Sequence, residues 1–120
     1  MASHVLTSLE QRALARALSK VTVPAWRDAL LRQAVDVRVR SRSEKTVGYY
    51  VDFDVPPALR IPDLSDDDFN KHPPAAEADH PDGKNGIFFL VYVKDGALSF
   101  MEASSTADWP EDEDRIVFVD

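Results

Sequence analysis

The spacing of apolar residues changes near residue 35, from intervals of three and four to strict alternation, and this change limits the chain to a fold that mixes helices with strands. Before it, Thr7 and Glu10 have the spacing of a capping box, and Pro24 suits the first position of a second helix. Trp26 would pack inward from that second helix. The apolar residues at helical spacing in the first helix are Leu6, Leu9, Ala13, Leu14, Ala17, Leu18 and Val21. We therefore predict a helical hairpin over residues 1–34.

Alternation of apolar and polar residues predicts a β-hairpin over residues 35–55. One alternating run extends from Val35 to Val39, and a second extends from Val47 to Val55 after a polar turn. In an antiparallel pair, arginines of the first run would face aspartates of the second on the wet side of the sheet. These residues are Arg38 and Arg40, opposite Asp52 and Asp54. We expect them to form a solvated, paired face.

The last third of the chain carries the strongest strand signals. The run from Ile87 to Val93 is apolar throughout, which is typical of a central strand covered on both faces. Asp95-Gly96 then favours a type I′ turn, because both residues tolerate positive φ. A returning strand over residues 97–103 and a final strand over residues 115–119 follow. We expect residues 87–120 to form the C-terminal hairpin and the last strand of the sheet.

Residues 56–86 separate these hairpins and contain six prolines and an Asp66-Asp67-Asp68 run. We predict a long Pro/Asp-rich loop there, with a short helix near residues 65–70. The fold expected for residues 1–120 is therefore a single α+β domain. It has two N-terminal helices packed on an antiparallel sheet of about five strands. If one sheet edge stays open, a homodimer is an alternative to a monomer.

Composition narrows the classes of function. A chain of 120 residues without cysteine holds one core and excludes disulfides, thiolate nucleophiles and cysteine-ligated metals. The net charge of −7 is uneven: residues 1–50 carry +5, whereas residues 51–120 carry −12. Such acidity argues against nucleic acid as the main partner and suits a basic protein. Residues 1–4 lack the features of a secretion signal and no apolar run spans a bilayer, so we expect a cytoplasmic protein with no membrane partner.

A resemblance adds to this interpretation. The segment from Phe89 to Glu102, with its Asp95-Gly96 turn and its Met101-Glu102 end, resembles the C-terminal hairpin of small bacterial proteins of unknown function. In those proteins the hairpin ends in Leu-Glu and a Trp-Pro pair follows, as Trp109-Pro110 does here. Residues 6–10 are also similar to their first helix. Some similar small acidic proteins are immunity partners of bacterial toxins, so the resemblance implies an immunity-like or antitoxin-like role.

The residues themselves offer two kinds of site. Imidazole and carboxylate ligands suit zinc, manganese or iron, and they occur together in the 56–86 segment without a recognised ligand spacing. The metal candidates are His72, His80 and Asp79, with Asp66, Asp67, Asp68, Glu77 and Asp82 nearby. No nucleophile motif, phosphate loop or cofactor motif occurs, so we expect no cofactor and name no catalytic residue. The interaction candidates are Trp109 with Glu111, Asp112, Glu113 and Asp114, and Glu102 at the end of the hairpin.

These candidates support three hypotheses. The leading one is a non-enzymatic protein-interaction domain that covers a basic protein, with Trp109 as an aromatic anchor beside four acids. In the alternative interpretation of Trp109, the ring folds back over the sheet edge as a cap. The second hypothesis is a metal-dependent enzyme that uses the His/Asp loop. The third is a nucleic-acid binder that uses Arg38, Arg40 and Arg42.

Overall fold

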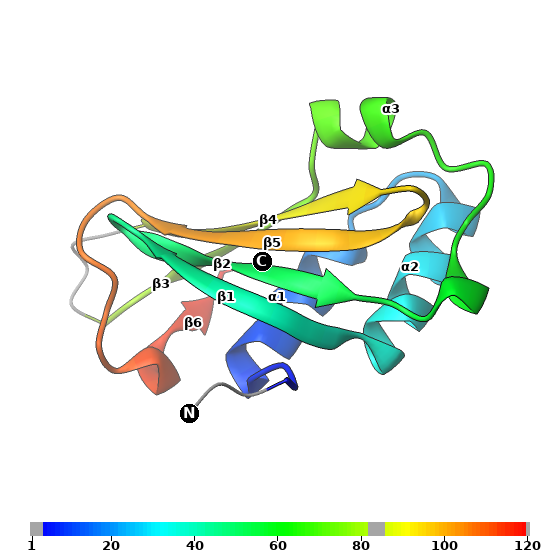
Figure 1. Cartoon of the computed structure of the whole chain (residues 1–120). Helices are drawn as coiled ribbons and strands as arrows, with labels where there is room; N and C mark the ends of the chain where they lie inside the picture. Colours follow the sequence, from blue (N-terminus) through cyan, green and yellow to red (C-terminus); the bar gives the residue numbers. More distant parts are fainter. Residues whose placement is uncertain (1–3, 82–85, 120) are drawn as a thin grey trace.

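A six-stranded antiparallel sheet forms the centre of the molecule, and two N-terminal helices pack on one of its faces (Figure 1). The structure, a computed structural model, describes residues 4–81 and 86–119. The helices are α1 (Ser8–Leu18) and α2 (Pro24–Asp36). The strands are β1 (Arg38–Lys45), β2 (Gly48–Asp54), β3 (Ala75–Asp79), β4 (Gly86–Lys94), β5 (Ala97–Ser105) and β6 (Val117–Phe118). They lie in the order β1-β2-β5-β4-β3-β6, so the α+β class is confirmed and the two C-terminal hairpin strands are central.

The two helices begin where their capping signals predict. Thr7 Oγ1 accepts a hydrogen bond from the Glu10 amide at 3.1 Å, and the Thr7 amide donates to Glu10 Oε1 at 2.9 Å. This reciprocal pair is the predicted capping box, and it satisfies two amides that a helix end leaves without partners. Pro24 occupies the first turn of α2, where its missing N–H costs nothing. None of the described helices is long and apolar enough to cross a membrane.

The expected start of the first strand was wrong at Val35. The helix α2 continues to Asp36, and Val35 lies in its last turn with 82% of its surface exposed. The strand β1 begins at Arg38, although Val37 and Val39 are buried as the alternation requires. Three alternating residues fit a helix end as well as a strand start, and the segment contains no Gly or Pro that would end the helix earlier. The sequence pattern therefore located the strand but not its first residue.

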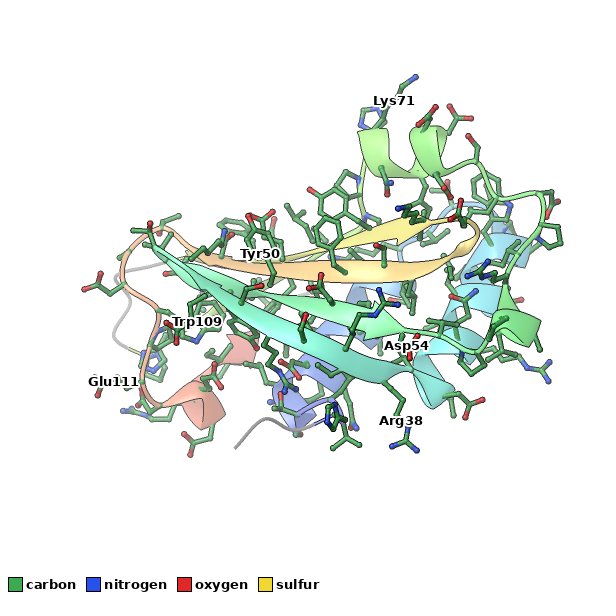
Figure 2. All side chains as sticks on the ribbon, viewed as in Figure 1. Arg38, Tyr50, Asp54, Lys71, Trp109 and Glu111 are labelled. Carbon is green, nitrogen blue, oxygen red and sulfur yellow. The ribbon has the colours of Figure 1, made fainter. Side chains whose placement is uncertain are left out.

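The predicted pairing of β1 with β2 is observed, with one irregularity. Arg40 Nη2 lies 3.4 Å from Asp54 Oδ1, and Arg38 stands opposite Asp54 in the register (Figure 2). Asp52 accepts a hydrogen bond from Ser41 Oγ at 2.8 Å instead of pairing with an arginine. The difference comes from a shift of register between Val39 and Ser41. A β-bulge of this kind turns the residues that follow it toward the other face.

The segment between the hairpins contains more structure than the expected loop. A short helix, α3 (Asp66–Lys71), begins where the acidic run predicts, and Ser65 caps it. A single turn of 3-10 helix, η1 (Pro57–Leu59), precedes it. The strand β3, with the sequence Ala-Ala-Glu-Ala-Asp, pairs with both β4 and β6 and raises the strand number to six. These residues have low strand propensity, so the neighbouring strands rather than local preference specify β3.

The turn between β4 and β5 is held by side chains from distant parts of the chain. Asp95 and Gly96 have positive φ of 53° and 75°, as a type I′ turn requires. The fully buried Gln33 of α2 donates to the carbonyl oxygens of Leu59 and Gly96 at 2.8 and 3.0 Å. Its Oε1 accepts from the Leu98 amide at 2.9 Å. One amide side chain therefore joins α2 to the turn and to the segment that follows β2.

We predict that replacing Gln33 with methionine, which has a similar length, lowers the free energy of unfolding by about 3 kcal/mol, because buried backbone groups lose their partners. Urea denaturation monitored by circular dichroism measures this change. Arg32→Met, at the exposed neighbouring position of the same helix, is the matched control and should change stability by less than about 0.5 kcal/mol. Equal effects of the two substitutions would contradict a special role for the Gln33 amide.

Candidate functional site

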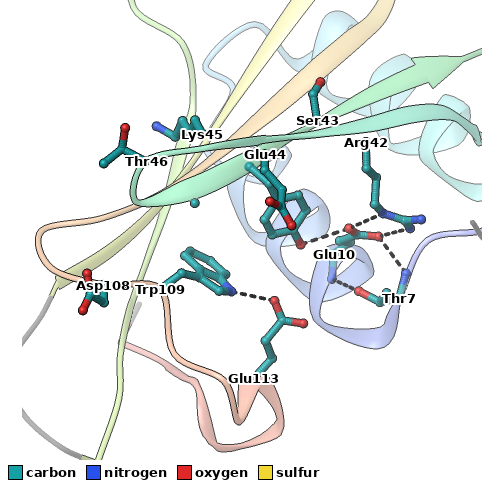
Figure 3. A pocket seen from close by; sticks show the side chains of 12 residues that line it. Thr7, Glu10, Arg42, Ser43, Glu44, Lys45, Thr46, Asp108, Trp109 and Glu113 are labelled. Atoms are coloured by element: carbon teal, nitrogen blue, oxygen red, sulfur yellow. Dashed lines mark hydrogen bonds and ion pairs between the residues drawn. The ribbon is translucent and has the colours of Figure 1, made fainter.

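A pocket of about 720 Å³ opens between the N-terminus of α1, the β1–β2 hairpin and the loop after β5 (Figure 3). Two aromatic side chains, Tyr49 and Trp109, line it. Their rings meet edge to face with centroids 5.5 Å apart, and the Trp109 ring also contacts Phe89 of the core at 6.1 Å. The pocket volume lies in the range that holds small ligands or a partner's side chain.

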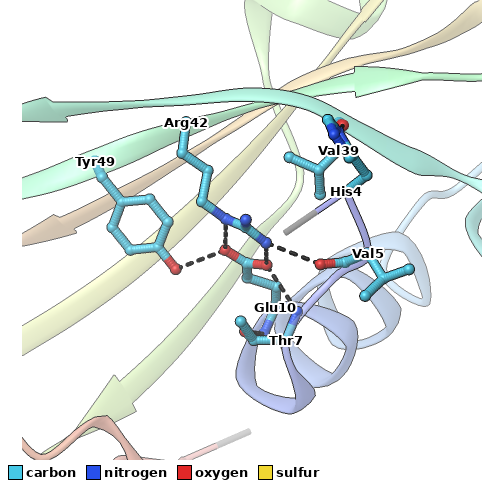
Figure 4. Close-up of polar contacts among 7 residues, drawn as sticks. All are labelled: His4, Val5, Thr7, Glu10, Val39, Arg42 and Tyr49. Atoms are coloured by element: carbon cyan, nitrogen blue, oxygen red, sulfur yellow. Dashed lines mark hydrogen bonds and ion pairs between the residues drawn. The ribbon is translucent and has the colours of Figure 1, made fainter. Parts of the chain in front are cut away.

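The carboxylate of Glu10 lines this pocket and accepts four hydrogen bonds (Figure 4). Arg42 binds it with two nitrogens: Nη2 lies 2.7 Å from Oε1, and Nε lies 3.0 Å from Oε2. The Tyr49 hydroxyl donates to Oε2 at 3.0 Å, and the Thr7 amide donates to Oε1. The Glu10 side chain is 1% exposed, so these bonds replace the water that an ionised carboxylate needs.

The electrostatics of this network keep each group in one protonation state. Burial works to raise the pKa of Glu10, but hydrogen bonds from Arg42 and Thr7 outweigh it, so the pKa lies below its ordinary value. The Glu10 carboxylate raises the pKa of Arg42. Burial, followed by the negative charges of Glu10 and Glu113, raises the pKa of Tyr49. None of the three groups titrates near neutral pH, so the network suits structural support better than proton transfer.

The loop after β5 contains most of the interaction candidates, and its side chains bond within the molecule. Trp109 Nε1 donates to Glu113 Oε2 at 2.6 Å, and the ring is partly buried. This geometry is that of a ring folded back onto the sheet. Asp112 lies 2.8 Å from the buried His80 Nε2 and 3.4 Å from Arg115. Desolvation works to raise the pKa of Asp112, but its own backbone, His80 and Arg115 together outweigh it, so the pKa lies below its ordinary value. Glu111 and Asp114 are exposed at the outside of the loop.

Glu102, the remaining interaction candidate, lies elsewhere, on the sheet face that is opposite α1 and α2. We call this the outer face, and its three central strands carry five large, partly exposed apolar side chains. They are Tyr50, Phe88, Leu90, Tyr92 and Phe100. Tyr92 and Phe100 stack with centroids 4.5 Å apart and planes 13° apart, and Tyr50 meets Phe100 at 6.2 Å. Glu102 binds Lys45 Nζ at 2.7 Å beside this row of rings.

The outer face corrects the expectation that the apolar run of β4 is covered on both sides. Ile87, Phe89 and Val91 point toward the helices and are fully buried. Their neighbours Phe88 and Leu90 point the other way and remain partly exposed. The run is apolar throughout, but the helices cover only one of its faces. The apolar side chains on the other face therefore form a partly exposed surface.

The metal candidates do not converge. His72 ends α3 and is exposed, whereas His80 is buried at the other end of β3, and the five residues of that strand separate them. Asp79 is exposed on β3, and Asp66 accepts the amides of the β4–β5 turn. No group of three or more His, Asp or Glu side chains within residues 4–81 and 86–119 is arranged to hold a metal ion. Asp82 lies outside the described residues.

The arginines of β1 also serve separate purposes. Arg42 turns inward to Glu10, and Arg40 pairs with Asp54. Arg38 is exposed near the strand's start and points away from the sheet in Figure 2. They therefore do not form one basic surface of the kind that binds phosphates. Sequence reasoning noted Glu10 only as a helix cap and Arg42 only as a strand arginine, and it missed their pairing.

Comparison of the chain with protein-family models, curated proteins and solved structures found no match. The resemblance to small bacterial proteins of unknown function thus stays a prediction, and any functional argument rests on the surfaces described above.

We predict that Glu10→Gln lowers the free energy of unfolding at pH 7 by about 3 kcal/mol, because the guanidinium of Arg42 loses its ionic partner. The folded pKa of Glu10 is lowered, so its contribution is present above the unfolded value of about 4.3 and is lost as the pH falls through the folded pKa. The stability difference between wild type and variant should therefore shrink below about pH 4.

Urea denaturation between pH 3 and pH 7 checks this prediction. Glu77→Gln, an exposed carboxylate on β3, is the matched control and should follow the wild-type curve throughout. A difference between wild type and Glu10→Gln that stays constant over this range would show that Glu10 acts through its shape and not through its charge.

Proposed function

We propose that this chain is a non-enzymatic protein-interaction domain whose outer face binds a basic protein. The observation that carries the proposal is the row of apolar side chains across the three central strands β2, β5 and β4, partly exposed and opposite the helices. Contiguous apolar surface of this kind is rare on soluble monomers and marks interaction sites. Tyr92, Phe100 and Tyr50 are also the residue types that anchor interfaces.

The charges around the outer face favour a basic partner over a second copy of the chain. Asp52 stands opposite Phe100 and Glu77 stands opposite Phe88 in the strand register, and the exposed Asp79 follows on β3. Glu102 is balanced by Lys45. Two copies that met through this face would bring these carboxylates together, and each copy carries a net charge of −7. A basic surface would instead gain from the same charges, both in encounter rate and in specificity.

The form of interaction that the sequence resemblance supports is an immunity-like or antitoxin-like one, in which the acidic domain covers a basic toxin. A sheet face whose central strands are paired on both sides suits this task, because little conformational entropy is lost when it binds. The loop with Glu111 and Asp114 would extend the negative surface beyond the sheet.

We predict that the chain captures a basic protein at low salt from a lysate of its source, and that two outer-face substitutions weaken the purified complex. Tyr92→Ser removes part of the ring stack and should raise the dissociation constant by at least about tenfold. Asp79→Lys reverses a charge beside the face and should raise it by about fivefold at low salt, with less effect at high salt. Isothermal titration with the purified partner measures both constants.

The matched controls lie on α2, on the opposite side of the molecule. Val35→Ser removes an exposed apolar residue and Asp36→Lys makes the same charge change as Asp79→Lys, and neither should alter binding. Thermal unfolding confirms that each variant is folded. The proposal fails if the partner binds Tyr92→Ser as tightly as wild type. It also fails if sedimentation shows a dimer of the chain alone that Tyr92→Ser dissociates, because the face then joins two copies.

A further inference from the structure

We infer that the pocket between Trp109 and Glu10 binds a guanidinium or alkylammonium group. The inference deepens the proposed function, since it takes that group to be an arginine or lysine side chain of the basic partner. The pocket lies on the side of the sheet that faces α1, opposite the outer face, and opens between the β1–β2 hairpin and the loop after β5 (Figure 3). A partner that extends from the outer face around the edge strand β1 would place a side chain in it.

The charge balance of the lining favours a cation. The carboxylates of Glu44 and Glu113 line the pocket in addition to Glu10, and Glu113 accepts a hydrogen bond from the Trp109 indole at 2.6 Å. The two lining cations are already neutralised: Arg42 by Glu10, and Lys45 by Glu102. Lys45 Nζ also contacts Ser104 Oγ and lies 5.5 Å from the centre of the Tyr50 ring. These contacts place the ammonium group on the outer face. The lining therefore keeps an excess of negative charge that a bound cation would balance.

The aromatic walls favour an organic cation over a metal ion. Guanidinium and ammonium groups bind to the faces of Trp and Tyr rings, and Trp109 and Tyr49 stand together in this pocket. Burial of a side-chain stem against these rings would add apolar contact. A metal ion instead needs several converging oxygen or nitrogen ligands, and no such group occurs among the residues that the structure describes.

The features that would favour an anion are already matched within the molecule. The N-terminus of α1 attracts negative charge, but Glu10 and the Thr7 cap occupy it. The guanidinium of Arg42 is held by the same carboxylate through two hydrogen bonds. The ion pair of Arg42 with Glu10 therefore offers an anion no net positive charge, and the carboxylates of Glu44 and Glu113 would repel it. A cation has no such obstacle.

A titration with a small probe tests the pocket without the partner. N-acetyl-arginine amide is added to ¹⁵N-labelled protein, and the indole N–H signals of the two tryptophans are followed by NMR. Trp109 lines the pocket, whereas Trp26 on α2 is an internal reference. We expect the Trp109 signal to shift and saturate while the Trp26 signal stays constant. The neutral, equally shaped N-acetyl-citrulline amide should leave both signals unchanged.

Two matched variants locate the charge. Glu44→Gln removes a lining carboxylate and should weaken probe binding by about fivefold. Glu111→Gln removes an exposed carboxylate of the neighbouring loop that does not line the pocket and should have no effect beyond about twofold. The inference is overturned if the Trp109 signal does not shift, if Trp26 shifts equally, or if citrulline amide acts like arginine amide.

The source of the cation is decided by a second measurement, with the partner. If a side chain of the partner enters the pocket, Glu44→Gln weakens the complex and partner binding blocks the arginine probe. If the arginine probe binds the free protein and the protein–partner complex with equal affinity, the pocket takes a free small cation and its assignment to the partner's side chain is wrong. If the outer-face substitutions do not weaken the complex, the proposed function is wrong. Binding of the arginine probe to the free protein is measured independently, so the two failures are distinguishable.

Discussion

An ionised carboxylate can be buried only when other groups replace its water, and Glu10 meets this requirement with partners from three parts of the chain. The Thr7 amide comes from the start of α1, Arg42 from β1 and the Tyr49 hydroxyl from β2. Among the described residues, Glu10 is the one fully buried carboxylate. This one carboxylate therefore links α1 to both strands of the β1–β2 hairpin. The Trp109 ring packs on Tyr49 at the same point, so the shape of the pocket depends on it too.

The uneven charge of the sequence has a structural counterpart. The positive half supplies Arg42 and Lys45, which are used internally against Glu10 and Glu102. Most of the remaining acids of the second half face solvent on β3, α3 and the loop after β5. Most of the other lysines and arginines are exposed as well, so the negative net charge of −7 comes from the larger number of carboxylates.

The sequence predicted the two helices, the capping box, the turn at Asp95-Gly96 and the central position of the hairpin, because each has a strong local signal. It did not predict β3, since Ala-Ala-Glu-Ala-Asp has no local preference for a strand and is specified by its neighbours. The pairing of Glu10 with Arg42 was hidden by the bulge after Val39. Strict alternation places Arg42 on the same face as Arg38, and only the extra residue turns it inward. The outer face was missed because an apolar run cannot show whether its second side is covered.

The strand order has a consequence for how the chain reaches this structure. The central pairing of β2 with β5 joins residues 48–52 to residues 100–104, so about half of the chain separates the partners. Bringing two segments so far apart in the sequence together costs chain entropy before their contacts form, and this slows folding. During synthesis the helices and the first hairpin emerge before β5, the strand that completes their core. We therefore expect the sheet to close only after β5 has emerged, with β2 exposed as an edge until then.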